Sequence, residues 1–328
     1  MSIRLHRAFA VLLFLGVAAC SGSGVVSSSQ VADSAITSFQ ADQIIDTQTG
    51  EVMALDQLIG HVRDQEVIYL GEEHHNRFHV ESARTVLTRL VAEGRQPVLA
   101  MEMFGWDVQP ILDRYVLTKE LSRQEFLETV RWQQNWGGPF DNYEPLVQFA
   151  KEQGLPLVSL NPPKSLIRSV AKQGLAKARQ GEEMAQWGMQ NETIVEDSAY
   201  RTRIFQQLRA CHDGGSDALY EAMYEASMVR DEGMASMIAS KVTQLRTENA
   251  PHAGPVISYT GGGHIQFNLP VPKRVARRLD NHVRQMSIYM TSFEKDRIGD
   301  LQEMIKEKIA DLVWLTPVSA EGPPRRCR

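Results

Sequence analysis

The sequence predicts an α/β fold, in which a mostly parallel sheet is flanked by helices and carries an all-helical insertion or subdomain. Short apolar runs alternate with amphipathic helical segments through residues 67–160 and again after residue 255, a pattern typical of βαβ units. Between these two parts, residues 164–248 form long stretches rich in Ala, Gln, Met and Arg, without a candidate strand.

Residues 1–19 have the composition of a secretory signal peptide. Arg4 and Arg7 precede an apolar run, residues 8–19, that is too short to cross a bilayer. The segment Val-Ala-Ala-Cys that ends at Cys20 resembles a bacterial lipobox, in which the cysteine becomes the acylated first residue of the mature chain. An ordinary cleaved signal with an incidental cysteine is the alternative.

The tether that follows is rich in Ser and Gly, which suits a flexible link between a lipid anchor and a folded body. Ser21, directly after Cys20, resembles the outer-membrane sorting class of lipoproteins. We therefore expect a lipoprotein of the bacterial cell envelope, anchored at the outer membrane by palmitate-type acylation.

Length and composition allow one large core, since the chain has 328 residues of which 43% are hydrophobic. Without residues 1–19 the chain keeps 33 basic and 40 acidic residues, and we expect no nucleic-acid partner for such a mildly acidic protein. Cys211 and Cys327 remain after lipidation of Cys20, and we expect both to be free thiols.

The predicted domain organisation follows these changes in composition along the chain. It comprises a signal peptide (1–19), a lipidated tether (20–40), an α/β body in two pieces (41–163 and 249–320) and a helical subdomain (164–248).

The elements of the α/β body can be assigned in order from turn signals and periodicity. The expected strands are 67–71, 98–104, 155–160, 255–260, 286–290 and 312–315, after a hairpin turn at 46–50. The expected helices are 55–62, 78–92, 107–117, 122–131, a helix that ends at 153, and 294–309, with a Trp- and Gly-rich loop at 132–143.

Two of these strands end in the same form, Gly-x-x-His: Gly71 to His74 and Gly261 to His264. If both strands are parallel in one sheet, the two imidazoles share its carboxyl edge, where α/β sheets keep their sites. Glu102, near the end of the second strand, belongs to the same edge. Two histidines with a carboxylate are a ligand set for Zn, Mn or Fe, so His74, His264 and Glu72 are candidate metal ligands.

Simpler roles compete with this one. Glu72 and Glu73 could be acids in the first turn of a helix, favoured by its dipole. His79 could share a helix face with His75, although a solvated His75 is the simpler expectation. For Glu102 the structural alternative is weaker, because a carboxylate inside an apolar strand costs several kcal/mol unless it is paired or hydrated.

The helical part holds Cys211-His212-Asp213 and a series of Tyr and Met residues at helical spacing. Such a series is most often core, and the functional alternative is an apolar wall with a His or Tyr as axial haem ligand. No Cys-x-x-Cys-His, Gly-x-Ser-x-Gly, Walker loop or His-Glu-x-x-His motif is present.

Eight segments form an ordered set of motifs, at residues 70–79, 100–104, 143–146, 160–163, 212–214, 261–264, 271–276 and 313–317. Together and in this order, they resemble the motifs of the ChaN-like haem-binding uptake lipoproteins of the Tiki/TraB superfamily. One departure is His75, where the family more often has Asp.

The resemblance implies a lipid-anchored protein that binds haem for haem or iron uptake, with a possible homodimer that holds haem at its interface. It points to Glu72, His74, His79, Glu102, His212 and His264 as cofactor-binding residues. The axial ligand stays open among His212, Tyr220, Tyr224 and Tyr259.

Related branches of the superfamily imply an alternative, a metal-dependent peptidase or esterase. His74, His264 and Glu72 would then hold a divalent metal, and Glu102 would act as general base on a bound water. We favour the binding protein over the enzyme.

Overall fold

The computed structural model describes residues 38–211, 214–319 and 322. The predicted signal peptide, Cys20, His212 and Cys327 lie outside these residues. Within them, no helix combines the length and the apolar character that a membrane span requires.

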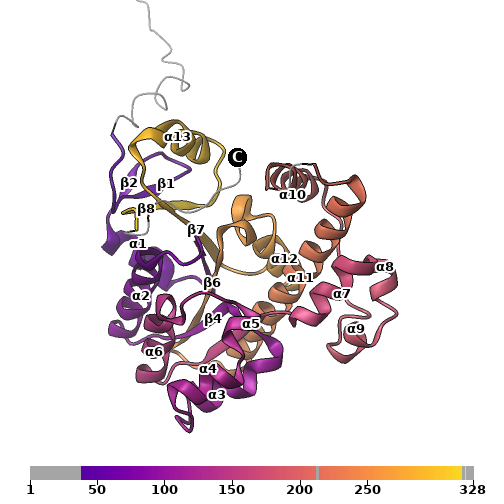
Figure 1. Cartoon of the computed structure of the whole chain (residues 1–328). Helices are drawn as coiled ribbons and strands as arrows, with labels where there is room; N and C mark the ends of the chain where they lie inside the picture. The colour runs from indigo at the N-terminus through magenta and orange to yellow at the C-terminus, as the bar shows by residue number, and fades with distance from the viewer. Residues whose placement is uncertain (1–37, 212–213, 320–321, 323–328) are drawn as a thin grey trace, which may run out of the picture.

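An eight-stranded sheet forms the centre of the fold, in the order β2-β1-β8-β7-β3-β6-β4-β5 (Figure 1). The strands are β1 (Ile44–Asp46), β2 (Val52–Met53), β3 (Val67–Glu72), β4 (Gln96–Gly105), β5 (Leu157–Asn161), β6 (Ala253–Gly261), β7 (Gln285–Ser292) and β8 (Leu312–Thr316). The six strands from β8 to β5 are parallel, and β1 pairs antiparallel with β2 and β8. The predicted α/β fold with a mostly parallel sheet is confirmed.

Helices cover both faces of this sheet. They are α1 (Leu55–Arg63), α2 (Arg77–Ala92), α3 (Gln109–Val116), α4 (Arg123–Thr129), α5 (Trp132–Asn135), α6 (Glu144–Gln153), α7 (Lys164–Gln173), α8 (Leu175–Ala178), α9 (Glu182–Gln186), α10 (Ser198–Cys211), α11 (Asp217–Glu248), α12 (Val271–Arg278) and α13 (Ile298–Lys306).

The central strand β3 is buried on both faces, which explains its continuous apolar run. Ile68 and Leu70 face the core shared with α1 to α4 and α6, whereas Val67 and Tyr69 face the core shared with α11 and α12. The period-2 alternation of a strand thus serves two cores at once.

The stretch predicted to be helical, residues 164–248, contains α7 to α11 and no strand among its described residues. The C-terminal half of α11 packs on the sheet through Met234, Ile238 and Val242. Its N-terminal half extends past the sheet toward α7 to α10 (Figure 1). The division into an α/β body and a helical subdomain stays a prediction.

Two local predictions need correction. The helix expected at 294–309 is shorter, since α13 ends at Lys306 and Lys308 has a positive φ of 54°. The expected loop at 132–143 contains the short helix α5, which places Trp136 beside the carboxyl edge of the sheet.

Candidate functional site

The carboxyl ends of β3, β4 and β6 meet at one edge of the sheet, as the paired motifs predict. β3 and β6 are adjacent and parallel, with Glu72 opposite Gly261, and β4 lies on the other side of β6. His264 follows in the single 3-10 turn η3 (Gly262–His264). The topology therefore brings both Gly-x-x-His motifs and Glu102 to the same edge.

Glu72 is buried and accepts hydrogen bonds from three side chains. Tyr259 Oη donates over 2.8 Å, Tyr143 Oη over 3.0 Å, and His74 Nδ1 lies 2.8 Å from Oε1. Burial raises the pKa of Glu72, and the three donors offset only part of this effect. Because its oxygens are already in use, Glu72 orients His74 and has little capacity left for a ligand.

His74 is the accessible member of this group, with 47% of its side chain exposed. Its ring stands edge-on to Trp136, with centroids 5.0 Å apart. The ring also passes over Gly261, where an added Cβ would lie 2.7 Å from His74 Cε1. Burial lowers the pKa of His74, but the hydrogen bond to Glu72 and the charge of Glu102 outweigh it, and the net pKa is raised.

Gly261 therefore has a steric role that the sequence shows only as a glycine at a strand end. Its φ of −56° is open to any residue, so the close approach of His74 is what requires glycine here.

His264 lies between two carboxylates. Its Nδ1 is 2.6 Å from Asp231 Oδ1 and its Nε2 is 3.2 Å from Glu102 Oε1. Burial alone would lower its pKa, but the two carboxylates raise the pKa to about 10, so the ring is an imidazolium at neutral pH. Glu102 also accepts from the Gly261 N–H over 2.7 Å, and the positive charge of His264 holds the Glu102 pKa far below its usual range despite burial.

The predicted metal ligands His264 and Glu72 are engaged by protein groups in this structure. Both nitrogens of His264 are in contact with carboxylates, and both oxygens of Glu72 already accept hydrogen bonds. Among the described residues, no three His, Cys, Asp or Glu side chains have an arrangement that could hold a metal ion. Glu102 is also a poor general base, since its pKa is strongly lowered.

His79 and Glu73 form a separate group behind the site. His79 has no solvent-exposed surface. Its Nδ1 accepts from the Glu73 N–H over 2.9 Å, and its Nε2 contacts Asn76. His79 is therefore enclosed by protein groups in this arrangement, and its contact with a cofactor stays a prediction. Glu73 accepts from Thr291 and Ser292, which fastens this loop to β7.

The loop before α2 corrects two further expectations. Asn76 caps α2, which begins at Arg77, so neither Glu72 nor Glu73 lies in its first turn. His75 has a left-handed backbone with φ 66°, and its N–H donates to Tyr143 Oη. His75 and His79 thus do not share a helix face.

The candidate axial tyrosines lie inside the protein. Tyr259 is fully buried with its hydroxyl on Glu72, Tyr224 is buried in the core between α10 and α11, and Tyr220 Oη accepts from the Gly215 N–H. His212 lies outside the described residues. Cys211 is disulfide-bonded, so the prediction of a free thiol there is wrong; its partner lies outside the described residues.

Two cavities flank His74. The smaller, about 330 Å³, has an apolar wall that includes Met103, Trp136 and Ile167. Its charged lining comprises the cations Lys164 and Arg230 and the carboxylates Glu102 and Asp107. The larger, about 690 Å³, extends between the sheet edge and α10, past Ile204, Leu208, Tyr289 and Met304. Both volumes are in the range of ligand pockets.

Two buried polar atoms beside the smaller cavity have no hydrogen-bond partner, Arg230 Nε and Asn161 Oδ1. Buried polar groups are otherwise nearly always paired. Haem is an anionic, aromatic iron chelate. Its binding requires an apolar wall, an accessible imidazole such as His74, and a cation such as Arg230, whose Nε is unpaired. The residues therefore fit the predicted cofactor.

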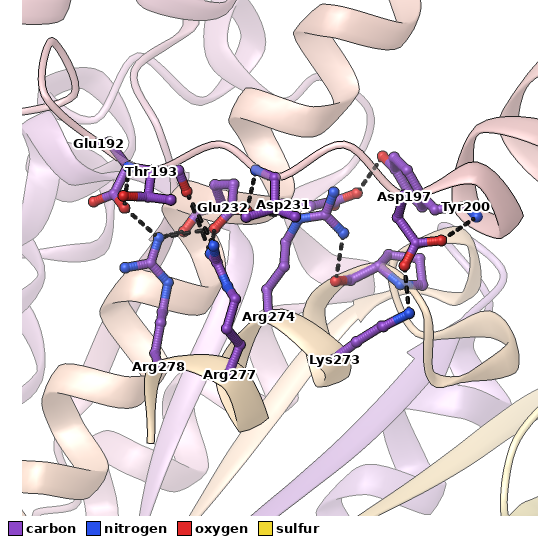
Figure 2. Close-up of polar contacts among 12 residues, drawn as sticks. Glu192, Thr193, Asp197, Tyr200, Asp231, Glu232, Lys273, Arg274, Arg277 and Arg278 are labelled. Atoms are coloured by element: carbon purple, nitrogen blue, oxygen red, sulfur yellow. Dashed lines mark hydrogen bonds and ion pairs between the residues drawn. The ribbon is translucent and has the colours of Figure 1, made fainter. Parts of the chain in front are cut away.

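A charged network fixes α12 and α11 behind this edge. In Figure 2, the basic side chains of α12 point toward carboxylates of α11 and of residues 192–197. Buried Glu232 accepts from Arg277 over 2.6 Å and from Arg278 over 2.8 Å, and Arg274 Nε lies 3.3 Å from it. The neighbouring Asp231 accepts from Tyr200 Oη over 2.6 Å, which links α10 to His264.

Sequence reasoning assigned no site role to Asp231, Tyr143, Trp136 or Arg230. Asp231 and Glu232 did carry a usable signal, because two acids interrupt the apolar pattern of a helix, as Glu102 does in its strand. Tyr143 begins the motif at 143–146 that contributed to the family resemblance, but the motif did not show its contact with Glu72. For Trp136 and Arg230 no local signal exists, since their positions depend on tertiary contacts.

Comparisons with known proteins agree with this fold. The family described as haem-binding uptake, Tiki superfamily, ChaN matches residues 58–275. A solved structure of ChaN of Campylobacter jejuni, described as showing cofacial haem binding, is 18% identical and covers 83% of this chain and 95% of that chain, with a TM-score of 0.62. At this identity the likeness establishes the fold.

Two further similarities concern other kinds of protein. An erythromycin esterase is 16% identical, covering 77% of this chain and 76% of that chain, but its TM-score of 0.41 carries no functional argument. Protein RETICULATA-RELATED 5, chloroplastic, of Arabidopsis thaliana is 22% identical over 280 residues; the match covers 80% of this chain and only 35% of that protein.

The family match spans about two thirds of the sequence, from α1 into α12, and includes both Gly-x-x-His motifs and Glu102. The chain therefore belongs to the ChaN family of haem-binding uptake proteins in the Tiki superfamily.

Proposed function

We propose that this chain binds haem at the carboxyl edge of its sheet, beside His74, and serves haem or iron uptake as a lipid-anchored protein. The observation that carries the proposal is the orientation and solvent exposure of the His74 ring. Its Nδ1 is fixed by buried Glu72, and its half-exposed ring lies between the two cavities. The proposal extends the family relationship to particular atoms of this chain.

The pair of His74 and Glu72 has the arrangement found behind metal-binding histidines. A carboxylate that accepts from Nδ1 fixes the tautomer and leaves the Nε2 lone pair available to a metal centre. Among the described residues, no hydrogen bond involves His74 Nε2. Haem, when bound, supplies the iron; Glu72 keeps the imidazole oriented, and Trp136 packs against its ring.

The two sides of the smaller cavity suit the two parts of haem. Met103, Trp136 and Ile167 offer apolar surface for a porphyrin, and Lys164 with Arg230 offers positive charge for its carboxylates. Arg230 Nε has a spare donor, whereas Lys164 Nζ already donates to Gln134 O over 2.7 Å. Arg230 is therefore the stronger candidate partner of a propionate.

Anchoring and assembly are further parts of the proposal. Cys20 would carry the lipid at the outer membrane, and the tether up to residue 40 would separate the anchor from β1. A homodimer would shield the exposed side of the bound haem. Light scattering with and without haemin tests for the dimer, and mass spectrometry of the mature N-terminus tests for the lipid.

The decisive experiment is a titration of the purified full-length chain with haemin, followed in the Soret region. We expect a saturable band shift near stoichiometric protein, a loss of affinity in His74→Ala, and a loss of roughly 10–100-fold in Glu72→Gln, because the carboxylate that orients the ring is gone. His252→Ala, an exposed histidine outside both cavities, is the matched control.

Haemin dimethyl ester, which lacks the two carboxylates, distinguishes the contribution of the cationic residues of the cavity from that of its apolar wall. If Arg230 binds a propionate, Arg230→Gln weakens haemin binding and leaves binding of the ester unchanged. A wild-type chain without a saturable shift would rule out haem binding at this edge, and an unchanged His74→Ala would rule out His74 as the contact.

A further inference from the structure

A second pocket lies at the opposite, amino edge of the parallel sheet. It has a volume of about 410 Å³ and lies where α1 ends, α11 ends, and β4, β6 and β7 begin. Its apolar floor is formed by Val242, Leu245 and Pro255. None of the residues of the haem proposal lines it.

Four arginines from four separate segments surround this pocket, Arg63, Arg95, Arg246 and Arg284, and the carboxylates that line it are Asp64 and Glu66. Four guanidinium charges against two carboxylates leave the lining with two excess positive charges. Guanidinium groups from several directions are the arrangement proteins use to bind phosphate.

The carboxylates of the pocket already have partners within the protein. Glu66 accepts from Arg246 Nε over 2.8 Å and from the Arg284 N–H over 3.0 Å. Burial alone would raise the pKa of Glu66, but these bonds lower it overall. Asp64 lies 3.5 Å from Arg63 Nε, a long contact between two exposed groups.

The guanidinium groups of Arg95 and Arg284 are the ones available to bind an anion. Arg95 donates to the carbonyl oxygens of Ala253 and Gly254, and no carboxylate of the described residues pairs with it. Arg284 donates to Asp64 O over 2.8 Å, lies 3.8 Å from Glu66, and has 69% of its side chain exposed. Backbone contacts orient both guanidinium groups. Arg95 has no carboxylate partner among the described residues, and Arg284 has only the long contact with Glu66, which also accepts from Arg246.

We propose that this amino-edge pocket binds a phosphate dianion, either free or as the terminal group of a small phosphate ester. The doubly negative group would lie between Arg95 and Arg284 and match the two excess charges of the lining. The site is separate from the haem proposal and does not depend on it.

Calorimetric titration of the full-length chain with inorganic phosphate, at constant ionic strength, tests the proposal. We expect saturable binding that weakens roughly tenfold in Arg284→Gln and in Arg95→Gln, since each removes a charged donor. Arg168→Gln is the control, because Arg168 is exposed and lies outside the pocket. A parallel titration with glycerol 3-phosphate distinguishes an ester, which would bind more tightly, from free phosphate.

Thermal melts without phosphate show whether each variant folds, and Arg284→Gln keeps the test open if Arg95→Gln does not. No saturable heat for either probe with the wild-type chain would overturn the proposal, as would an equal weakening by Arg168→Gln. The haemin titration of Arg284→Gln should match wild type, which separates this site from the carboxyl edge.

Discussion

The two edges of the parallel sheet hold charged groups in opposite surroundings. At the carboxyl edge, Glu72, Glu102 and Asp231 are buried, and His264 lies between two of them. At the amino edge, Arg246 and Arg284 are exposed and pair with Glu66 at the pocket wall. Charges at the first edge are desolvated and strongly coupled, whereas those at the second are screened by water.

The difference shows how one sheet can support two kinds of site. Desolvated pairs fix side chains in one geometry and shift their pKa values, which suits the orientation of a single imidazole. Screened arginines contribute little to folding and stay available for an anion. The predictions below test this contrast between the edges.

The largest effect is expected from His264→Ala. The substitution leaves Glu102 and Asp231 buried without their shared cation, and breaking a buried pair in this way costs about 3–5 kcal/mol. Urea unfolding measures the loss in the free energy of unfolding. His61→Ala, at an exposed histidine, is the matched control, and a loss below about 1 kcal/mol, the value for a surface pair, would show that the edge is not desolvated.

The pH dependence of stability should be the next largest effect. The folded-state pKa of His264 is about 10, above the unfolded value of about 6.5, so its contribution is complete below pH 6.5 and is lost as the pH rises toward 10. Glu102 has a lowered pKa, and its contribution is lost as the pH falls below about 4.5.

Unfolding free energies of wild type and His264→Gln, measured between pH 6.5 and 10, test this sign. The difference between the two proteins should shrink steadily toward pH 10. A difference that stays constant or grows over this window contradicts the ion-paired imidazolium.

Gly261→Ala should have a smaller effect, confined to the haem proposal. The added Cβ would lie 2.7 Å from His74 Cε1 and displace the ring, so we expect haemin affinity to fall about tenfold. The proton resonances of His74 should shift as well. In the control, Gly299→Ala, an added Cβ meets no atom within 4 Å, and binding should not change.

The smallest effect is expected at the amino edge. Arg246→Ala removes the ion pair with Glu66, in which the arginine side chain is 40% exposed, and such pairs contribute less than about 1 kcal/mol. The loss should diminish further at high salt, because exposed charges are screened. If Arg246→Ala lowers the free energy of unfolding as much as His264→Ala does, the amino edge is not more screened by water than the carboxyl edge.

Much of the fold could be predicted from local pattern. The strands β3 to β8 correspond to apolar runs bounded by turn residues, and α2 corresponds to a segment with helical periodicity that ends at Gly94. The short helix α5 was missed, because its position depends on Trp132 packing in the aromatic core near Phe104 and Phe140.

The candidate site was predictable only in part. Gly-x-x-His at two strand ends and an acid in a third strand predicted that these residues share one edge, because parallel strands place their carboxyl ends together, and the sheet has this arrangement. The metal site that the same pattern suggested, with His264 as a ligand, stays a prediction. The contact of His264 with Asp231 of α11 could not be foreseen from spacing.

The sequence by itself determined the place of the site, since the order of apolar runs and glycines fixes which residues end the strands. Only the tertiary structure decided the role of each side chain. Burial and the neighbouring side chains set the protonation and the solvent access of each histidine. His264 lies between Glu102 and Asp231, and His79 is fully buried. His74 remains exposed to solvent, because Gly261 leaves room for its ring.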